Sequence, residues 1–179
     1  AALDAVRLLM LAQAQACFCE KAMGDGLGAS TQAKLCLGAK QLYRRAADAL
    51  AALKVSAKKM HAWGADIAMG RAEQFEAQAR WSLAKEAEKE SQHGLRQAQL
   101  QLAAAAVAQA QSRLAAKAAA EAVGEKELGA LSSLAAKVGA ELAAVKRDNE
   151  LVYYEKPPDP ATLDEPDAKV LVKPLRLEA

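Results

Sequence analysis

Apolar residues recur at steps of three and four along most of this chain, the spacing of one face of an α-helix. All five prolines lie at or beyond position 157. Because proline removes a backbone donor and clashes with the preceding turn, residues 1–156 can form long unbroken helices. The pattern predicts helices over 2–23, 30–54, 57–90, 93–121 and 126–153, followed by an extended, proline-containing tail over 154–179.

Three glycines, at positions 24, 26 and 28, separate the first two predicted helices. Glycine is a poor interior residue of a helix and a good stop signal, so a tight antiparallel turn is expected there, with Ser30 capping the second helix. Gly124 predicts a second turn, between the last two helices.

The last two predicted helices carry regular apolar stripes that favour a coiled-coil-like hairpin, in which alanines let the two backbones approach closely. The alternative is a solvated, alanine-rich helix. Most of the bulk of helix 57–90 lies in the aromatic residues Trp63, Phe75 and Trp81 and in Ile67. The alternation of small and large residues in this helix is typical of tetratricopeptide-like packing. The stripes comprise Leu100, Ala103, Val107, Ala110 and Leu114 in one helix, and Leu128, Leu131, Ala135, Val138, Leu142 and Val145 in the other.

Composition narrows the class of protein. The chain is 53% hydrophobic but only 4% aromatic, so its core is expected to be closely packed helices with few large anchors. A net charge of +2 gives no electrostatic basis for binding nucleic acid. We expect a soluble, cytosolic protein without a membrane span or signal peptide, because no window of about eighteen consecutive apolar residues is seen.

The charges themselves are unevenly distributed. Seven basic residues and one acid lie between positions 34 and 59, including Lys40, Arg44 and Arg45, whereas the acids dominate from Glu150 to Asp167. The acidic tail can fold back on the basic side, or the basic side can serve an anionic partner or membrane. An ordinary solvated face is the third alternative.

No catalytic, metal or cofactor site is predicted. Cys17 and Cys19 are about 200° apart on a helix and cannot grip one ion, so Cys17, Cys19 and Cys36 are expected to be structural thiols. His61 and His93 have no neighbouring ligand pattern, and no phosphate loop or nucleophile elbow is present. We therefore expect a protein that is not an enzyme.

Two stretches resemble a known family. The sequence "LMLAQAQACFCEKA", Leu9 to Ala22, is similar to the LMLAQAQE-x-F-x-x-KA signature of the BRO-one domain family of Alix-type endosomal sorting adaptors. The sequence "AAVKRDNELVYYEKPPD", Ala143 to Asp159, resembles the K-x-DND-x-IYH-x-x-VP segment of that family. The resemblance covers nearly all of 1–179 but only the rear half of the family's domain, as a helical body over 1–153 and a tail over 154–179.

The resemblance implies an all-α fold, a curved tetratricopeptide-like solenoid, and a non-enzymatic adaptor role. Its implied partner is the C-terminal amphipathic helix of an ESCRT-III subunit of the charged multivesicular body protein type. The implied contact is a hydrophobic concave patch that includes Phe18 and Leu35, with Lys21 complementing an acid on the partner. Thr31 occupies a further patch position and departs from the apolar pattern. Core packing is the alternative role for Phe18.

Tyr153 aligns with a tyrosine that the resemblance marks as a possible phosphotyrosine or docking residue, although a packing role for Tyr153 is the alternative. The implied location is the cytoplasm, with recruitment to endosomes for sorting into multivesicular bodies. The competing hypothesis is a membrane-surface helical scaffold that uses the basic stretch 34–59, with Lys40, Arg44 and Arg45 contacting anionic lipid. The segment Lys169 to Leu177 alternates apolar and polar residues and is interpreted as a docked tail or a linker.

Overall fold

The computed structural model describes residues 2–53 and 58–174; the side chains of 58–63, 117 and 118 are outside that description, as is everything of 1, 54–57 and 175–179. The described residues are helical over most of their length and contain no strand. The long helices are α1 (Ala2–Gly24), α2 (Ala29–Ala51), α3 (Lys58–Lys89), α4 (His93–Leu114) and α6 (Glu125–Asp148), and the short ones are α5 (Lys117–Val123), the π-helical turn η1 (Asn149–Tyr153) and the 3₁₀ turn η2 (Pro160–Thr162).

The all-helical prediction is confirmed, and most helix ends fall within a few residues of their predicted positions. One predicted helix, 93–121, is wrong: α4 ends at Leu114, and α5 begins at Lys117, after Ala116 adopts an extended ψ of 133°. Alanine favours helix on both sides of this break, so propensity could not reveal it. The short helix instead packs back on α3 and α4, and tertiary contact decides the break.

The capping prediction at Ser30 is also wrong. Helix α2 begins at Ala29 with Gly28 as its N-cap residue, and no side chain caps that end. The glycine turn itself forms, with Gly26 at φ 67°, in the left-handed region that glycine adopts without strain.

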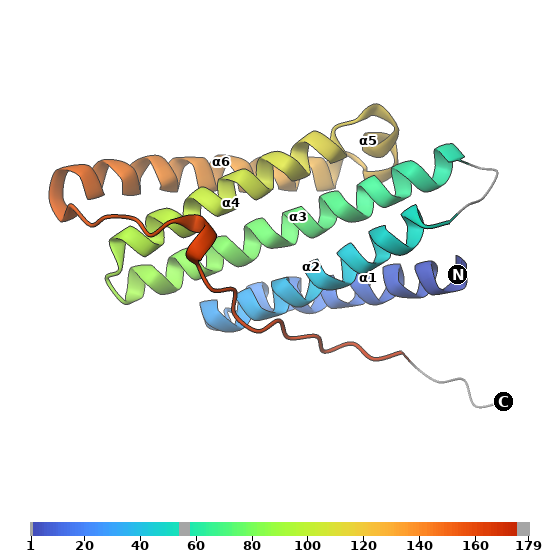
Figure 1. Ribbon diagram of the computed structural model, residues 1–179, viewed down its shortest axis with the longest axis horizontal. Helices are drawn as coiled ribbons and strands as arrows, with labels where there is room; N and C mark the ends of the chain where they lie inside the picture. The colour runs from blue at the N-terminus through green and yellow to red at the C-terminus, as the bar shows by residue number, and fades with distance from the viewer. Residues whose placement is uncertain (1, 54–57, 175–179) are drawn as a thin grey trace.

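Helices that follow one another in the chain lie side by side, in the order α1, α2, α3, α4, α6 (Figure 1). The buried residues that the structure describes form three clusters along this array. The largest joins α1, α2 and α3 around Cys19, Leu37 and Phe75. Most of its members are alanines with little or no exposed surface, so the backbones lie close together.

The two predicted apolar stripes face one another across α4 and α6. One core cluster contains Val107 and Leu114 of α4 together with Leu131 and Val138 of α6. A smaller cluster joins Leu100 to Val145 farther along the same pair of helices. The stripes are therefore buried against each other, and the alternative of a solvated α6 does not hold on this face.

After Tyr154, whose φ of 54° turns the chain out of η1, residues 155–174 leave the helical array and cross it toward α1 (Figure 1). Ala168 and Val172 pack against the α1–α2–α3 cluster. Lys173 and Pro174 reach the first turns of α1, so the two described ends of the chain line one groove. Glu165 of the acidic tail pairs with Lys40 of the basic stretch, so the tail folds back on that side of the protein.

Two segments, Ala2–Gly24 and Glu125–Tyr153, are long and apolar enough to cross a membrane by length and composition. This finding differs from the sequence expectation, which counted uninterrupted apolar runs. Alanine is the commonest residue in both segments, and each also packs against neighbouring helices. Core helices with such a composition satisfy the same test, so the finding is weak support for a span.

Candidate functional site

The predicted docking site is centred on Phe18, near the C-terminal end of α1. Phe18 is 43% exposed, so much of its side chain lies outside the core. The other phenylalanine in the sequence, Phe75, is buried. Lys21, one turn farther on, is exposed as well. These two residues therefore present an apolar and a basic group on the surface, as the sequence predicted.

The two predicted partners on α2 are placed differently. Thr31 is exposed, whereas Leu35 is only 3% exposed and belongs to the α1–α2–α3 core cluster. The structure thus corrects the expectation that Leu35 offers its side chain to a partner. Leu35 contributes packing beneath the surface, so the exposed apolar surface at Phe18 is smaller than the three aligned patch positions Phe18, Thr31 and Leu35 imply.

Gln15, which no sequence pattern marked as functional, lies one turn before Phe18 and has no exposed surface. Its side-chain amide donates to the Leu35 carbonyl at 3.2 Å and to the Lys169 carbonyl at 2.9 Å. The Leu171 N–H donates to the Gln15 Oε1 atom at 2.9 Å. One side chain therefore joins α1, α2 and the tail. A glutamine among the apolar residues of the quoted stretch was the available signal.

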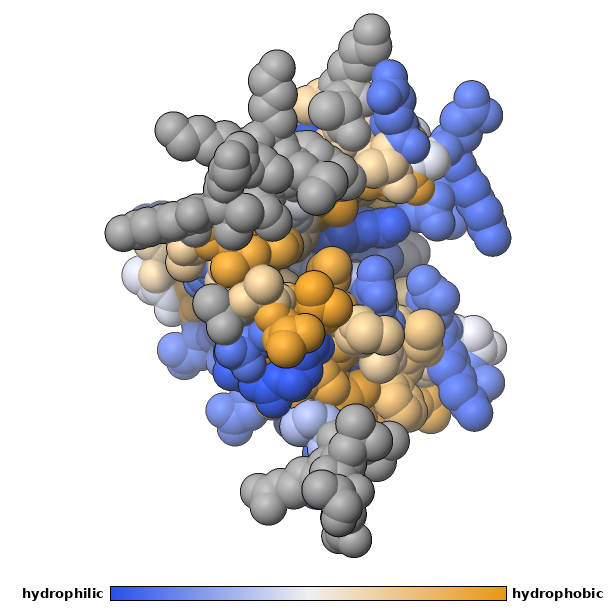
Figure 2. All heavy atoms as spheres, turned by 90° about the vertical axis from the view of Figure 1, so that its right-hand side faces the viewer, coloured by the Kyte–Doolittle hydropathy of each residue, from blue (hydrophilic) through white to orange (hydrophobic). Residues whose placement is uncertain are grey.

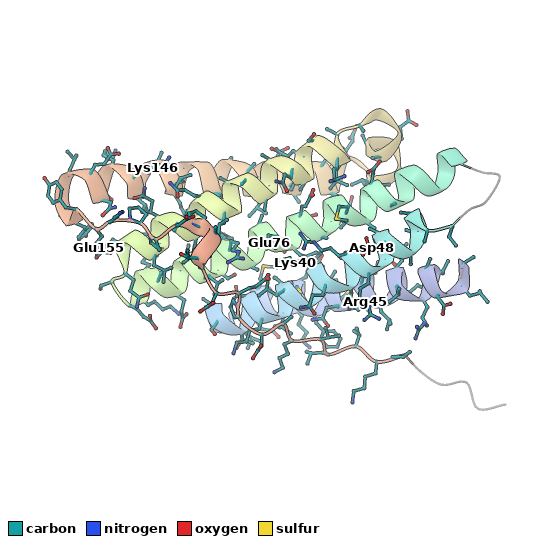
Figure 3. All side chains as sticks on the ribbon, viewed as in Figure 1. Lys40, Arg45, Asp48, Glu76, Lys146 and Glu155 are labelled. Atoms are coloured by element: carbon teal, nitrogen blue, oxygen red, sulfur yellow. The ribbon has the colours of Figure 1, made fainter. Side chains whose placement is uncertain are left out.

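Lys40 is not an exposed contact for anionic lipid, and that part of the prediction is wrong. The residue is 7% exposed, and its ammonium pairs with Glu76 of α3 and Glu165 of the tail. Figure 3 shows Lys40 and Glu76 between α2 and α3. Arg80 donates to the same Glu76 carboxylate at 2.8 Å. Burial alone would raise the pKa of Glu76, but the hydrogen bonds from Lys40 and Arg80 hold that pKa below its usual range.

Arg44 and Arg45 are exposed on α2, one turn beyond Lys40. Among the described residues of the predicted basic surface, Arg44 and Arg45 are the exposed ones. Lys34 is half-buried, and its carbonyl accepts from the Lys169 N–H at 2.8 Å. Lys54 lies outside the described residues, as do the side chains of Lys58 and Lys59.

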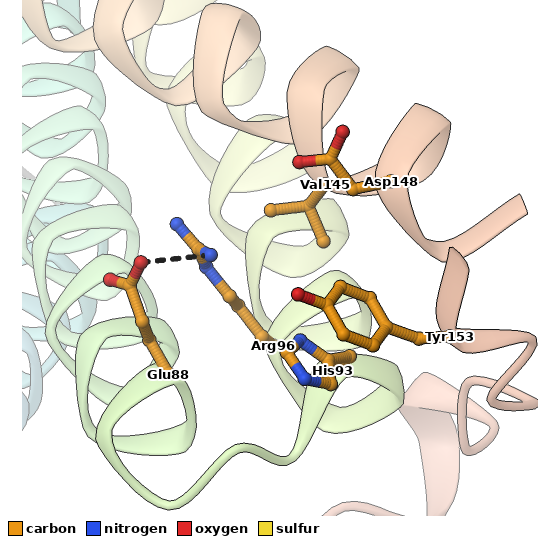
Figure 4. Close-up of a pocket in the computed structure, with 6 residues that line it drawn as sticks. All are labelled: Glu88, His93, Arg96, Val145, Asp148 and Tyr153. Atoms are coloured by element: carbon orange, nitrogen blue, oxygen red, sulfur yellow. Dashed lines mark ion pairs between the residues drawn. The ribbon is translucent and has the colours of Figure 1, made fainter. Parts of the chain in front are cut away.

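Tyr153 closes η1 and stacks on His93 of α4, with ring centroids 3.4 Å apart and an interplanar angle of 7°. The stacked rings border a pocket of about 140 Å³, which Arg96 enters while pairing with Glu88 at 2.9 Å (Figure 4). His93 therefore packs against an aromatic ring and is not a free surface residue. Tyr153 keeps part of its ring exposed.

Asn149, in the second family-like stretch, is buried and holds the chain reversal that follows η1. Its side chain donates to the Glu155 carbonyl at 2.7 Å and accepts from the Glu155 N–H at 3.0 Å. The Glu155 carboxylate in turn accepts from the Gly94 N–H at 2.6 Å. These three hydrogen bonds set the direction in which the tail leaves η1.

Cys17 and Cys19 lie on opposite sides of α1, as their spacing predicts: Cys17 is exposed and Cys19 is buried. Cys36 of α2 is buried as well. Contact with Cys19, together with burial, raises the pKa of the Cys36 thiol. A protonated, enclosed thiol is a poor nucleophile. Cys19 and Cys36 belong to different helices, so their contact could not be predicted from the spacing of the cysteines.

A second apolar surface lies at the beginning of α1. Leu3, Val6 and Met10 are exposed and line a groove of about 700 Å³ together with Lys173 and Pro174 of the tail. Figure 2 faces the end of the molecule where α1 begins and shows apolar side chains gathered there.

The comparisons with known proteins give the family. Residues 1–179 match the BRO1-like domain family. The chain belongs to this family. The BRO1-like chain is similar to a solved structure described as an ALIX BRO1 CHMP4C complex, with a TM-score of 0.81, 25% identity, and coverage of 97% of this chain and 44% of that one.

The BRO1-like chain also resembles the fold of ALIX in complex with the SIVmac239 PYKEVTEDL late domain, with a TM-score of 0.79 and 24% identity. That match covers 97% of this chain and 23% of the other. The chain therefore spans less than half the length of the solved structures it matches. The comparison with curated proteins gave no match.

Proposed function

We propose that this BRO1-like chain is a non-enzymatic adaptor that binds the C-terminal amphipathic helix of an ESCRT-III subunit at the surface around Phe18. The exposure of the Phe18 ring beside the α1–α2 turn carries the proposal. Support comes from the similarity to an ALIX BRO1 domain solved with CHMP4C. The chain corresponds in this proposal to the rear half of the domain, and its setting is the cytoplasmic side of endosomes during sorting into multivesicular bodies.

The chemistry of the surface suits an amphipathic helix. Such a partner presents apolar anchors at three- and four-residue steps, and a shallow apolar surface between two long helices receives them. Phe18 supplies an aromatic anchor, and Lys21, one turn away, can pair with an acid on the partner. A partly exposed ring on a preformed helix needs little rearrangement on binding, which favours fast exchange.

Substitution of Phe18 by aspartate tests this function, with a CHMP4C C-terminal helix peptide as the probe. Truncating a central aromatic anchor costs roughly 2 kcal/mol or more, which corresponds to about thirtyfold weaker binding. Because the ring is partly exposed, the thermal melt followed by circular dichroism should shift little. Leu3→Asp is the matched control, on an exposed residue of the same helix about 22 Å away. An unchanged dissociation constant for Phe18→Asp would refute the function.

A membrane-surface scaffold remains the second candidate, since Arg44 and Arg45 are exposed together on α2. Liposome flotation with anionic vesicles distinguishes the two functions. Flotation that survives Phe18→Asp and is lost when Arg44 and Arg45 are both changed to glutamate favours the scaffold. Peptide binding that is lost in Phe18→Asp and kept in the double arginine variant favours the adaptor.

A further inference from the structure

A cavity of about 430 Å³ lies between α1, α2, α3, α5 and the first turn of α6. On α1 it is lined by Leu9, which is nine residues before Phe18. Nine residues place the two side chains about 180° apart around a helix. The cavity is therefore separate from the proposed docking surface. Its volume falls in the range of small-molecule sites, about 300–1,000 Å³.

Four aliphatic side chains contribute to the walls of this cavity. They are Leu9 of α1, Leu50 of α2, Ile67 of α3 and Val123 of α5. Each of them is half-buried, so each keeps part of its apolar surface open. An apolar ligand body that covers these side chains would remove that surface from water.

The cavity also contains a cation without a counter-charge. Arg71 is half-buried and lines the cavity, and its Nη1 atom donates to the Gln74 Oε1 atom at 2.9 Å. None of the carboxylates that the structure describes pairs with Arg71. Arg80 and Arg96, the other described arginines that are buried or half-buried, each pair with a glutamate. The remaining donors of the Arg71 guanidinium are thus available to an anion from outside.

The one acid that lines the cavity lies at a helix end. The Glu127 Oε2 atom is 3.4 Å from the position of a Cβ atom on Gly124, the N-cap residue of α6. A carboxylate is stabilised there by the positive end of the helix dipole. Glu127 therefore has a local reason for its position and leaves Arg71 unpaired.

Tyr43 is the second polar group without a partner. It lines the same cavity and is only 6% exposed, and its hydroxyl forms no hydrogen bond with any residue that the structure describes. Its ring is held by stacking on Phe75, with centroids 5.7 Å apart. Burial raises the pKa of Tyr43 to about 12, although the nearby charge of Arg71 acts to lower it. The hydroxyl keeps its proton at neutral pH and can donate, so two donors in one cavity lack an acceptor.

A glycine leaves the cavity open. Among the described atoms, a Cβ atom on Gly64 of α3 would meet only the Leu50 Cδ1 atom, at 3.9 Å. A Cβ atom on Gly70 or Gly94 would instead lie 2.7 or 3.0 Å from a neighbour, so close packing accounts for those two glycines. Glycine inside a helix costs stability relative to alanine. At position 64 that cost has no packing reason, and its consequence is free space in the cavity.

We propose that this cavity binds a small anionic amphiphile. The anionic head, a carboxylate or a group of similar geometry, accepts from the Arg71 guanidinium and from the Tyr43 hydroxyl. The aliphatic or aromatic body covers the apolar walls. Arg71 supplies the charge, Tyr43 orients the head, and Gly64 leaves room for the body.

Octanoate, a carboxylate on an aliphatic chain, is the probe. Nitrogen–proton correlation NMR of the chain should show saturable shifts of the Gly64 and Val123 N–H signals as octanoate is added. Arg71→Gln should weaken octanoate binding about tenfold, because the charge-assisted hydrogen bonds are lost. Arg147→Gln is the matched control, since Arg147 is exposed and lies on α6 outside the cavity, and it should bind octanoate unchanged. Octanol, which has no charge, should bind the unaltered chain and Arg71→Gln equally weakly.

Two further variants test the room and the second donor. Gly64→Leu should fill the cavity and abolish the octanoate shift at Val123, and its thermal melt should not fall, since leucine favours helix. Gly139→Leu is its control, because a Cβ atom on Gly139 meets no atom within 4 Å. Tyr43→Phe keeps the ring and removes the hydroxyl, and it should weaken octanoate binding while leaving octanol binding unchanged.

The outcomes decide both the site and the class of ligand. An unaltered chain whose Gly64 and Val123 signals do not move with octanoate overturns the site. Octanoate binding that is unchanged in Arg71→Gln, or equal to octanol binding, overturns the anionic ligand. If Gly64→Leu does not fold, Arg71→Gln and Tyr43→Phe still decide, because neither adds volume to the cavity. Failure here leaves the proposed docking at Phe18 untouched, since the two sites share no residue.

Discussion

Replacing the buried Gln15 by leucine tests the link between α1, α2 and the tail most directly. Leucine has a similar volume and no hydrogen-bonding group, so the three bonds of the glutamine side chain disappear together. Three bonds at the usual net value amount to about 1.5–4.5 kcal/mol. The apolar leucine side chain recovers roughly 1 kcal/mol in the buried position.

The free energy of unfolding should therefore fall by about 1–3 kcal/mol in Gln15→Leu, measured by urea denaturation followed by circular dichroism. Without the Gln15 side chain the tail can leave α1, and the Lys169 carbonyl and the Leu171 N–H then bond to water. Hydrogen exchange at the Leu171 N–H should therefore also become faster. Gln13→Leu is the matched control, because Gln13 is exposed on the same helix. Equal stability of the two variants, with a protected Leu171 N–H in both, would refute the bridging role of Gln15.

Two further predictions concern the interior. Glu76→Gln should cost about 1–3 kcal/mol at neutral pH, because it weakens the pairing of buried Lys40 and Arg80. Since the pKa of Glu76 is lowered in the folded state, this stabilisation is present above the unfolded pKa of about 4.3 and is lost as the pH falls through the folded pKa. The difference from the unaltered protein in urea titrations should shrink as the pH is lowered below the unfolded pKa, and a constant difference would contradict this reasoning. Gly70→Ala should also destabilise, by about 1–3 kcal/mol, because a Cβ there lies 2.7 Å from the Leu114 Cγ atom. A thermal melt of Gly70→Ala no lower than that of Gly139→Ala would show that α3 and α4 adjust without cost.

The chain sequence by itself determined the helical class, the positions of most helices and the family. The periodicity of apolar residues and the confinement of proline to the tail are local signals, and a helix is stabilised by contacts within a few residues. The exposure of Phe18 agrees with its prediction from the signature. The contact that includes Leu131 and Val138 could be predicted because apolar residues recur regularly on both helices that form it, α4 and α6.

Only the tertiary structure decided the surroundings of that surface. Leu35 and Lys40 belong to stretches that the sequence marked as contact surface, yet both are buried: Leu35 lies in the α1–α2–α3 core cluster, and Lys40 pairs with Glu76, more than thirty residues away in the chain. Gln15 meets Lys169 and Leu171 across more than 150 residues, and no local pattern encodes such a pairing. Burial and hydrogen bonding are properties of groups brought together by the fold, whereas periodicity reports only which face of a helix is apolar.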